Sequence, residues 1–261
     1  MTLSIIIVSF NAKADLARCL ESLHSAPLRA AHEIIVVDNH SADGSAEATR
    51  AWPVVRVIEN DANVGFARAN NIGIRASTGD NILLLNSDTI VPPGAIDRLL
   101  DILNQHPDVA IVGPRLVDAA GRAELSFGRT LGPFNERRQK SRIRRPAVVE
   151  ALTRRAHSPD WVSGACLLVR RADAEAVGLL DERYFMYVED VDFGVAIRAR
   201  GRRVLFTPEV EVLHVRGRSA ASAPAATERA YRRSQIAYYE KHRPGWAPLL
   251  KLYLRLRGAD K

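Results

Sequence analysis

The chain has 261 residues, of which 47% are apolar and 26% charged, and its formal net charge is +7. This composition is typical of a globular protein and excludes the collagen-like and disordered classes. No apolar run approaches the roughly 18 residues of a membrane span, and the chain starts without a basic leader, so we expect neither a spanning helix nor a signal peptide. Cys19 and Cys166 lie far apart without metal-finger spacing, which predicts no disulfide framework, no structural zinc site and a reducing, cytosolic location.

Short apolar runs alternate with helical stretches through the first half of the chain. The apolar runs predict strands over residues 3–8, 33–37, 54–58 and 81–85. The stretches between them predict helices over residues 15–24, 45–50 and 65–76. This alternation indicates an α/β fold, with a mostly parallel central sheet and helices on both of its faces.

Polar residues follow three of the predicted strands, at residues 9–11, 38–41 and 86–88. Each group alone is typical of a turn, but all three fall beyond the carboxyl ends of strands, where a parallel sheet binds its ligand. The glycine fingerprints of dinucleotide-binding folds and of P-loops are absent. A bound pyrophosphate would therefore need another neutralising group, such as a divalent metal.

Asn86 and Asp88 lie two residues apart at the end of an apolar run. In extended backbone such positions point the same way, so both side chains can face one ligand. One carboxylate completed by substrate phosphates and water is a normal Mg²⁺ or Mn²⁺ site. The alternative is an Asx turn that ends the strand.

Three carboxylates, Glu189, Asp190 and Asp192, stand within four residues where an apolar stretch becomes a helix. Close carboxylates repel one another, which favours a nearby cation, a helix N-terminus or a role in proton transfer. Helix capping accounts for Glu189 or Asp190 but not for all three. His214 follows another apolar run, and it fits either a satisfied polar residue or a contact with metal or phosphate.

Basic residues gather in two parts of the chain. Residues 129–155 include nine basic and two acidic side chains, which fits either a solvated loop or a surface facing lipid headgroups, a diphosphate or nucleic acid. Residues 221–261 mix basic and aromatic side chains. We expect them to form a helical C-terminal extension suited to an anionic membrane surface.

Six segments in order resemble the motifs of family 2 glycosyltransferases, and most of all their rhamnosyltransferase-like branch. They are residues 4–11, 36–45, 63–73, 86–88, 161–166 and 189–192, so the resemblance spans nearly the whole chain. It implies a GT-A, Rossmann-like domain over residues 1–220, a nucleotide-sugar donor, a divalent metal (Mg²⁺ or Mn²⁺) and an inverting single displacement.

The resemblance also implies roles by position. Asp190 matches the catalytic base, with Glu189 and Asp192 as supporting candidates. Asp88 matches the metal-ligating end of the family's DxD motif, and His214 matches a histidine near the metal or diphosphate. The residues implied to hold the nucleotide sugar are Ser9, Asn11, Asp38, Asn39, Asn63, Gly65, Arg68, Asn70, Asn86 and Ser87.

The implied reaction moves a sugar to a lipid-linked or cell-envelope glycan acceptor, at the cytoplasmic face of the membrane. The branch favours L-rhamnose from dTDP-rhamnose, and a UDP-hexose-dependent transferase of the same fold is the alternative. Asn86 departs from the family's usual aspartate, which weakens the metal assignment.

Two other interpretations of the function, a different kind of enzyme and a binding module, fit the residues less well. A sugar-phosphate nucleotidyltransferase would need a glycine-rich, basic loop after the first strand, which residues 9–11 do not provide. A nucleic-acid-binding module fits the net charge but leaves the strand-end acids unexplained, because they would repel phosphate. We therefore expect no nucleic-acid partner, and the sequence does not set the oligomeric state.

Overall fold

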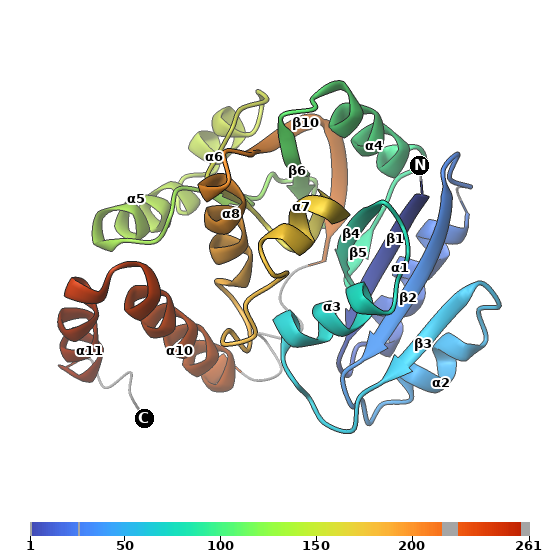
Figure 1. Ribbon diagram of the computed structural model, residues 1–261, viewed down its shortest axis with the longest axis horizontal. Helices are drawn as coiled ribbons and strands as arrows, with labels where there is room; N and C mark the ends of the chain where they lie inside the picture. The colour runs from blue at the N-terminus through green and yellow to red at the C-terminus, as the bar shows by residue number, and fades with distance from the viewer. Residues whose placement is uncertain (1, 26, 216–223, 257–261) are drawn as a thin grey trace.

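Eight strands form the central sheet of the computed structural model, which describes residues 2–25, 27–215 and 224–256 (Figure 1). The strands, with two short ones that pair outside this sheet, are β1 (Thr2–Ser9), β2 (Ala31–Asp38), β3 (Val55–Glu59), β4 (Asn81–Asn86), β5 (Thr89–Ile90), β6 (Val109–Val117), β7 (Phe127–Gly128), β8 (Trp161–Val162), β9 (Cys166–Arg170) and β10 (Arg203–His214). The helices are α1 (Lys13–His24), α2 (Ser45–Arg50), α3 (Phe66–Arg75), α4 (Ala95–Gln105), α5 (Pro133–Ile143), α6 (Pro146–Leu152), α7 (Arg171–Ala176), α8 (Glu189–Ala199), α10 (Pro224–His242) and α11 (Ala247–Leu256), with a 3-10 turn at Pro244–Trp246.

The strand order of the sheet is β3-β2-β1-β4-β9-β6-β10-β5. Strands β3, β2, β1 and β4 are mutually parallel, and β6 is parallel to β10. In contrast, β9 runs antiparallel to both β4 and β6. The predicted α/β class with a mostly parallel sheet is confirmed, and each element predicted up to β4 forms within two residues of its expected bounds.

Side chains of β1 alternate between two hydrophobic cores, one on each face of the sheet. Leu3, Ile5 and Ile7 pack with α1 and α4, whereas Ile6 packs with α3 and α8. All four side chains are fully buried. Burial on both faces explains why the strand is a continuous apolar run, and it leaves the strand ends as the place for polar groups.

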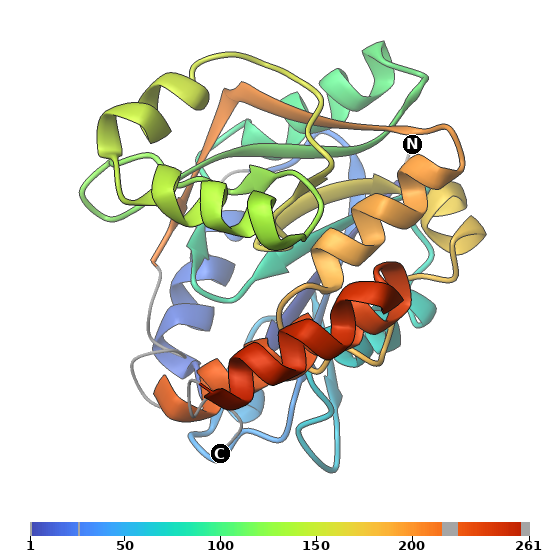
Figure 2. The same cartoon turned by 90° about the vertical axis from the view of Figure 1, so that its left-hand side faces the viewer.

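Helix α10, the first of the last two helices, packs beside α8, as Figure 2 shows. Tyr184 and Val191 form a small third core with Tyr238 and Tyr239 of α10. The predicted domain boundary at residue 220 lies outside the described residues. In the part of the chain that the structure describes, no helix is both long and apolar enough to cross a bilayer.

Candidate active site

The carboxyl ends of β1, β2 and β4 lie side by side. In the parallel register of these strands Ser9 pairs with Asp38, and Val8 pairs with Asn86. The polar residues that follow the three strands therefore share one edge of the sheet, as the order of elements predicted.

Four side chains at this edge keep a buried polar atom without a hydrogen-bond partner in the described chain. These atoms are Ser9 Oγ, Asp38 Oδ1, Asn70 Oδ1 and Asn86 Oδ1. Buried polar atoms in folded proteins are almost always hydrogen-bonded, so each exception needs an explanation. A polar ligand bound at this edge would supply the missing partners, and all four residues belong to the set predicted to hold a nucleotide sugar.

Three asparagines of the same predicted set already use their side chains within the protein. Asn39 Nδ2 donates to Asn63 Oδ1 at 2.8 Å and to the Gly65 carbonyl oxygen at 3.3 Å. Asn11 Oδ1 accepts the Ala42 N–H at 2.8 Å. These bonds hold the loops around the sheet edge, so the three asparagines shape this edge by fixing the loops.

The start of α3 lies very close to the segment that precedes α8. Gly65 has a φ of +87°, and a Cβ at this position would lie 2.4 Å from the Phe185 carbonyl oxygen. The Phe66 N–H donates to that same oxygen at 2.6 Å. Only glycine combines this backbone conformation with so close an approach. Tyr187 and Val188 follow with φ of 69° and 74°, so strained backbone leads directly into α8.

Two residues of the predicted set make their contacts away from the sheet edge. Arg68 Nε lies 3.8 Å from Glu182 Oε2, and the arginine side chain is mostly exposed. Asp192 accepts hydrogen bonds from Tyr184 OH at 3.1 Å and from Lys241 Nζ at 2.8 Å. Asp192 therefore anchors α10 to α8, and its supporting role in the reaction stays a prediction.

Asp88 and His214 are in contact at the end of β4. Asp88 follows Ser87 in the turn between β4 and β5, and its Oδ1 lies 3.3 Å from His214 Nε2. Asn86 Nδ2 lies 3.4 Å from the same ring nitrogen, so the two side chains face one point, as their spacing predicted. Glu124 Oε2 lies 3.1 Å from His214 Nδ1, on the other side of the ring.

Glu124 is a site residue that sequence reasoning missed. No motif marks it, because its contact joins positions 90 residues apart. Burial of the His214 ring lowers its pKa, but the hydrogen bonds to Asp88 and Glu124 outweigh burial and raise the pKa to about 9. The ring is therefore held as a cation between two carboxylates.

The donor atoms near His214 suit a divalent ion. A carboxylate and an imidazole are ligands that Mn²⁺ accepts, and Asn86 Oδ1 is a further buried oxygen without a partner in the described chain. Among the described residues, no three His, Cys, Asp or Glu side chains are arranged to enclose a metal. An ion at Asp88 and His214 would therefore take its other ligands from donor phosphates and water, and His214 would release its proton on binding.

Asp190 stands in the first turn of α8 and faces the loop of residues 163–165. Its Oδ2 accepts the Gly164 N–H at 3.2 Å, and its Oδ1 accepts the Val191 N–H at 2.8 Å. One residue further along the loop, the Ala165 carbonyl oxygen accepts the Asn86 N–H at 2.9 Å. The loop thus contacts the predicted base on one side and the end of β4 on the other.

Glu189 precedes Asp190 and is buried, and within the described residues its Oε2 has no hydrogen-bond partner. Burial and the negative charge of Asp190 raise the pKa of Glu189 well above its ordinary value. Glu189 therefore favours its neutral form.

Comparison with known proteins relates the chain to a family of enzymes. The family model described as "Glycosyl transferase family 2" matches residues 4–177. The chain is 32% identical to the N-acetylglucosaminyl-diphospho-decaprenol L-rhamnosyltransferase of Mycobacterium tuberculosis strain H37Rv, over 95% of this chain and 87% of that protein. It is 27% identical to the low-salt glycan biosynthesis hexosyltransferase Agl10 of Haloferax volcanii, over 81% of this chain and 66% of that protein.

Solved structures with the same fold are also glycosyltransferases. The mannosyltransferase PcManGT from Pyrobaculum calidifontis, in complex with GDP-Man and Mn²⁺, is 17% identical and has a TM-score of 0.65 over 99% of this chain and 70% of its own. GalNAc-T7 with UDP, GalNAc and Mn²⁺ is 20% identical and has a TM-score of 0.65 over 90% of this chain and 48% of its own. These neighbours confirm the GT-A fold.

Proposed function

The chain belongs to glycosyl transferase family 2, and we propose that it transfers L-rhamnose from dTDP-rhamnose to a lipid-linked sugar acceptor, with inversion at the anomeric carbon. The name of the Mycobacterium tuberculosis relative, an N-acetylglucosaminyl-diphospho-decaprenol L-rhamnosyltransferase, supports this donor sugar and this class of acceptor. A UDP-hexose donor on the same fold is the alternative, because a structural neighbour holds UDP.

The observation that carries this proposal is the loop of residues 163–165, which lies between Asp190 and the end of β4. Gly164 donates to Asp190, and the next residue of the loop accepts from Asn86. A sugar placed over this loop would direct its diphosphate toward Asp88 and His214 and its opposite face toward Asp190. A single displacement needs this two-sided arrangement, because the acceptor oxygen enters opposite the leaving group.

In this proposal Asp190 is the general base. Its carboxylate accepts the proton of the acceptor hydroxyl while that oxygen bonds to the anomeric carbon, and the sugar–diphosphate bond breaks with its electron pair passing to the diphosphate. The Gly164 and Val191 N–H groups hold the carboxylate in place. A divalent ion at Asp88 and His214 would stabilise the charge on the departing diphosphate.

The buried polar atoms of the sheet edge would bind the donor. Asp38 Oδ1 accepts and Ser9 Oγ donates or accepts, which suits the base and ribose of a nucleoside. Asn70 lies near the start of α3, and its Oδ1 could accept a hydrogen bond from a hydroxyl group of the sugar. A bound donor would therefore satisfy polar groups whose burial otherwise costs free energy.

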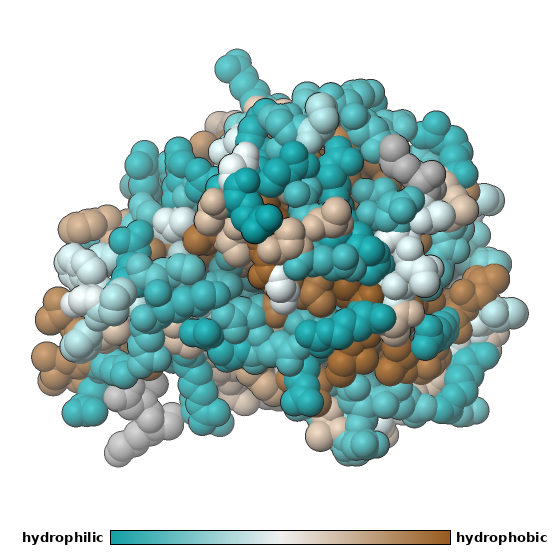
Figure 3. Space-filling view, in the orientation of Figure 1, coloured by the Kyte–Doolittle hydropathy of each residue, from teal (hydrophilic) through white to brown (hydrophobic). Residues whose placement is uncertain are grey.

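We also place the protein at a membrane surface, because α11 exposes an apolar stripe. Leu249, Leu252, Tyr253 and Leu256 are exposed at the i, i+3, i+4, i+7 spacing of one helix face. Figure 3 shows hydrophobic side chains at the left edge of the molecule, where Figure 1 places α11. An exposed apolar helix face with basic neighbours is typical of a helix that lies in the headgroup region of an anionic bilayer.

Replacement of Asp190 tests the proposed reaction. We expect Asp190→Asn to lower transfer by about 10² to 10⁴-fold, because it removes the proton acceptor, and to leave Mn²⁺-dependent binding of dTDP-rhamnose unchanged. Asp101→Asn, in an exposed ion pair on α4, is the matched control. Full turnover by the Asp190 variant would show that this residue is not the base. A separate thermal-shift measurement with a panel of nucleotide sugars and Mn²⁺ would identify the donor, because the bound sugar raises the melting temperature.

A further inference from the structure

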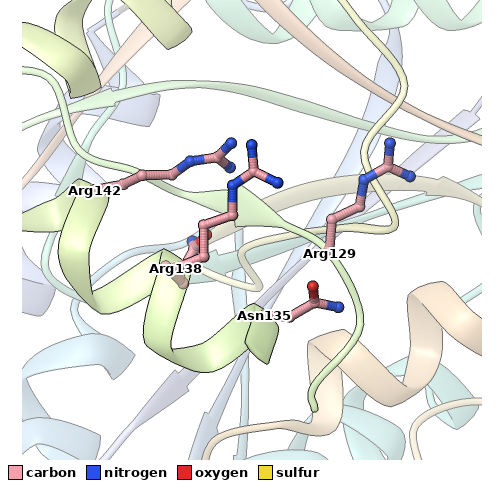
Figure 4. Close-up of a pocket in the computed structure, with 5 residues that line it drawn as sticks. Arg129, Asn135, Arg138 and Arg142 are labelled. Carbon is pink, nitrogen blue, oxygen red and sulfur yellow. The ribbon is translucent and has the colours of Figure 1, made fainter. Parts of the chain in front are cut away.

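Three arginine side chains converge on a cavity of about 180 Å³ that lies outside the site described above. The cavity is lined by Arg129, which follows β7, and by Asn135, Arg138, Gln139 and Arg142 of α5. The four α5 residues are spaced i, i+3, i+4 and i+7, so they form one face of the helix. Figure 4 shows the guanidinium groups of the three arginines extending to the same side.

The positive charge of this cavity is mostly unneutralised. Arg129 Nη1 lies 3.2 Å from Asp160 Oδ1, but the same carboxylate oxygen also pairs with an arginine of α8. Within the described chain neither Arg138 nor Arg142 forms an ion pair. Burial lowers the pKa of Arg142, and the neighbouring charges of Arg138 and Arg129 lower it further.

The one carboxylate of α5 does not reduce this charge, because it faces away. Glu136 Oε1 accepts from Tyr239 OH at 2.7 Å, which ties α5 to α10. Guanidinium groups that repel one another are stabilised by an anion that bonds to several of them at once. The cavity therefore has the size and chemistry of a phosphate or diphosphate site.

A short stretch of backbone connects the arginine cavity to the loop that bonds Asp190, and the lining of the cavity includes neither Asp88 nor His214. Ser126 precedes β7, and its carbonyl oxygen accepts the N–H of Ser163 at 2.8 Å, at the start of the loop that bonds Asp190. Arg129 follows three residues later, about 10 Å along extended chain. This span suits an acceptor whose hydroxyl lies at Asp190 while a phosphate, one sugar residue away, lies at the arginines.

The surroundings of the cavity are apolar and exposed. Phe134, beside Asn135 on α5, is 80% exposed. Three residues earlier, the Leu131 carbonyl oxygen accepts a hydrogen bond from Arg243 Nε at 2.7 Å, and Arg243 immediately precedes the turn that leads into α11. The turn into α11 is therefore tied to the chain just before α5, and the exposed stripe of α11 follows that turn.

We infer that the arginine cavity binds the diphosphate of the lipid-linked acceptor, with its lipid chain over Phe134 and α11. This inference rests on the proposed function, because it assigns the acceptor of that same reaction. A free phosphate would not need the exposed apolar surface, and an ordinary anionic lipid would not need a cavity with converging arginines.

The test compares two charge-matched double variants of the full chain. Arg138→Gln with Arg142→Gln removes the arginines of the cavity. Arg137→Gln with Lys140→Gln removes the same charge from exposed residues of α5 that do not line it. Binding is measured by co-sedimentation with phosphatidylcholine vesicles that contain either polyprenyl diphosphate or phosphatidylglycerol at equal surface charge, with and without inorganic pyrophosphate.

We expect the cavity variant to lose about tenfold or more in affinity for the polyprenyl diphosphate vesicles, because each charge-assisted hydrogen bond to phosphate is worth about a factor of ten. Its affinity for phosphatidylglycerol vesicles should match that of the control variant. Pyrophosphate should displace wild type and the control variant from polyprenyl diphosphate, because both keep the cavity arginines, and it should have little effect on the cavity variant. In transfer assays the KM for the lipid-linked acceptor should rise, with kcat and the donor KM unchanged.

Equal losses in both variants would show attraction to surface charge only and would overturn the cavity assignment, as would undiminished binding by the cavity variant. Arg138→Lys with Arg142→Lys keeps the charge without the guanidinium fork, and it should bind with intermediate affinity. Thermal melting of each variant shows whether it is folded. If no variant turns over any nucleotide sugar, the proposed function fails, but the vesicle result still decides what the cavity binds.

Discussion

Single polar residues at the sheet edge fall into two groups that the sequence does not separate. The side chain of Asn39 makes four hydrogen bonds within the protein, to Asn60, Asn63, Val64 and Gly65. Ser9 keeps a buried hydroxyl without a partner in the described chain. Both residues follow a predicted strand, and only the folded structure shows that the first holds loops together while the second is available to a ligand.

Alanine substitutions distinguish these two roles. Ser9→Ala should change the free energy of unfolding by less than about 0.5 kcal/mol, because no hydrogen bond within the protein is lost, and it should weaken nucleotide-sugar binding. Asn39→Ala should lower the free energy of unfolding by about 2–4 kcal/mol, because it removes buried hydrogen bonds worth about 1 kcal/mol each. Urea unfolding and donor titration measure both effects. Equal destabilisation by the two substitutions would contradict the distinction.

Glu124 should matter for the metal without contacting it. Its carboxylate orients His214 through Nδ1, and loss of such an orienting partner typically costs about 10–100-fold in metal affinity. We therefore expect Glu124→Gln to weaken Mn²⁺-dependent nucleotide binding by that factor, measured by calorimetry at fixed pH. Glu209→Gln, an exposed carboxylate paired with Arg98, is the control. Unchanged Mn²⁺ affinity in the Glu124 variant would place the ion elsewhere.

The contact between α8 and α10 links the base to the C-terminal helices. Asp192, two residues after Asp190, is nearly fully buried and pairs with Lys241 of α10 at 2.8 Å. Lys241 is about a third exposed and also pairs with Asp181, so removing the charge of Asp192 costs less than breaking a fully buried pair, about 1–3 kcal/mol. We expect Asp192→Asn to lower the free energy of unfolding by this order and to speed hydrogen exchange in α10.

The control for this prediction is Lys251→Gln, which breaks a half-exposed pair with Glu240. Such surface pairs contribute about 0.2–1 kcal/mol, so exchange in α10 should stay close to wild type. Similar exchange in the Asp192 and Lys251 variants would mean that the buried pair does not hold α10 in place.

Helices and strands with a clear hydrophobic pattern could be predicted from the sequence, and elements too short to show such a pattern could not. Strands β1 to β4 have five to eight residues each, are rich in apolar residues and are separated by helices, and their positions were predicted. Strands β7 and β8 have two residues each, too few for any periodic signal. The antiparallel course of β9 depends on its pairing with β4 and β6, which local sequence does not encode.

In the candidate site, too, local features could be predicted from the sequence and contacts between distant residues could not. The i, i+2 spacing of Asn86 and Asp88 predicted that they face one point, because that geometry is local. The contact of Glu124 with His214 was not predictable, because it depends on how β10 pairs with β6. The arginine face of α5 could have been found, since Asn135, Arg138 and Arg142 have helical spacing in the sequence.

For the molecule as a whole, the exposed stripe of α11 predicts membrane contact. Replacing Leu249, Leu252 and Leu256 together by Gln should lower partition onto phosphatidylglycerol vesicles by about tenfold or more, because each leucine buried in a bilayer contributes about 1.5–3 kcal/mol. Because these side chains are exposed, the folded state and transfer to a water-soluble acceptor should be unaffected. Val54→Gln, another exposed apolar residue, is the control. Unchanged partition of the triple variant onto the vesicles would show that α11 does not contact the membrane.

In the proposed reaction Asp190 and the Asp88–His214 pair act on opposite faces of the sugar, and this arrangement sets the stereochemistry. The anomeric configuration of the transferred sugar, read by NMR from the one-bond carbon–hydrogen coupling in donor and product, reports whether the acceptor enters opposite the diphosphate. This arrangement predicts inversion in the wild-type product and loss of product with Asp190→Asn. A product that retains the configuration of the donor would contradict it.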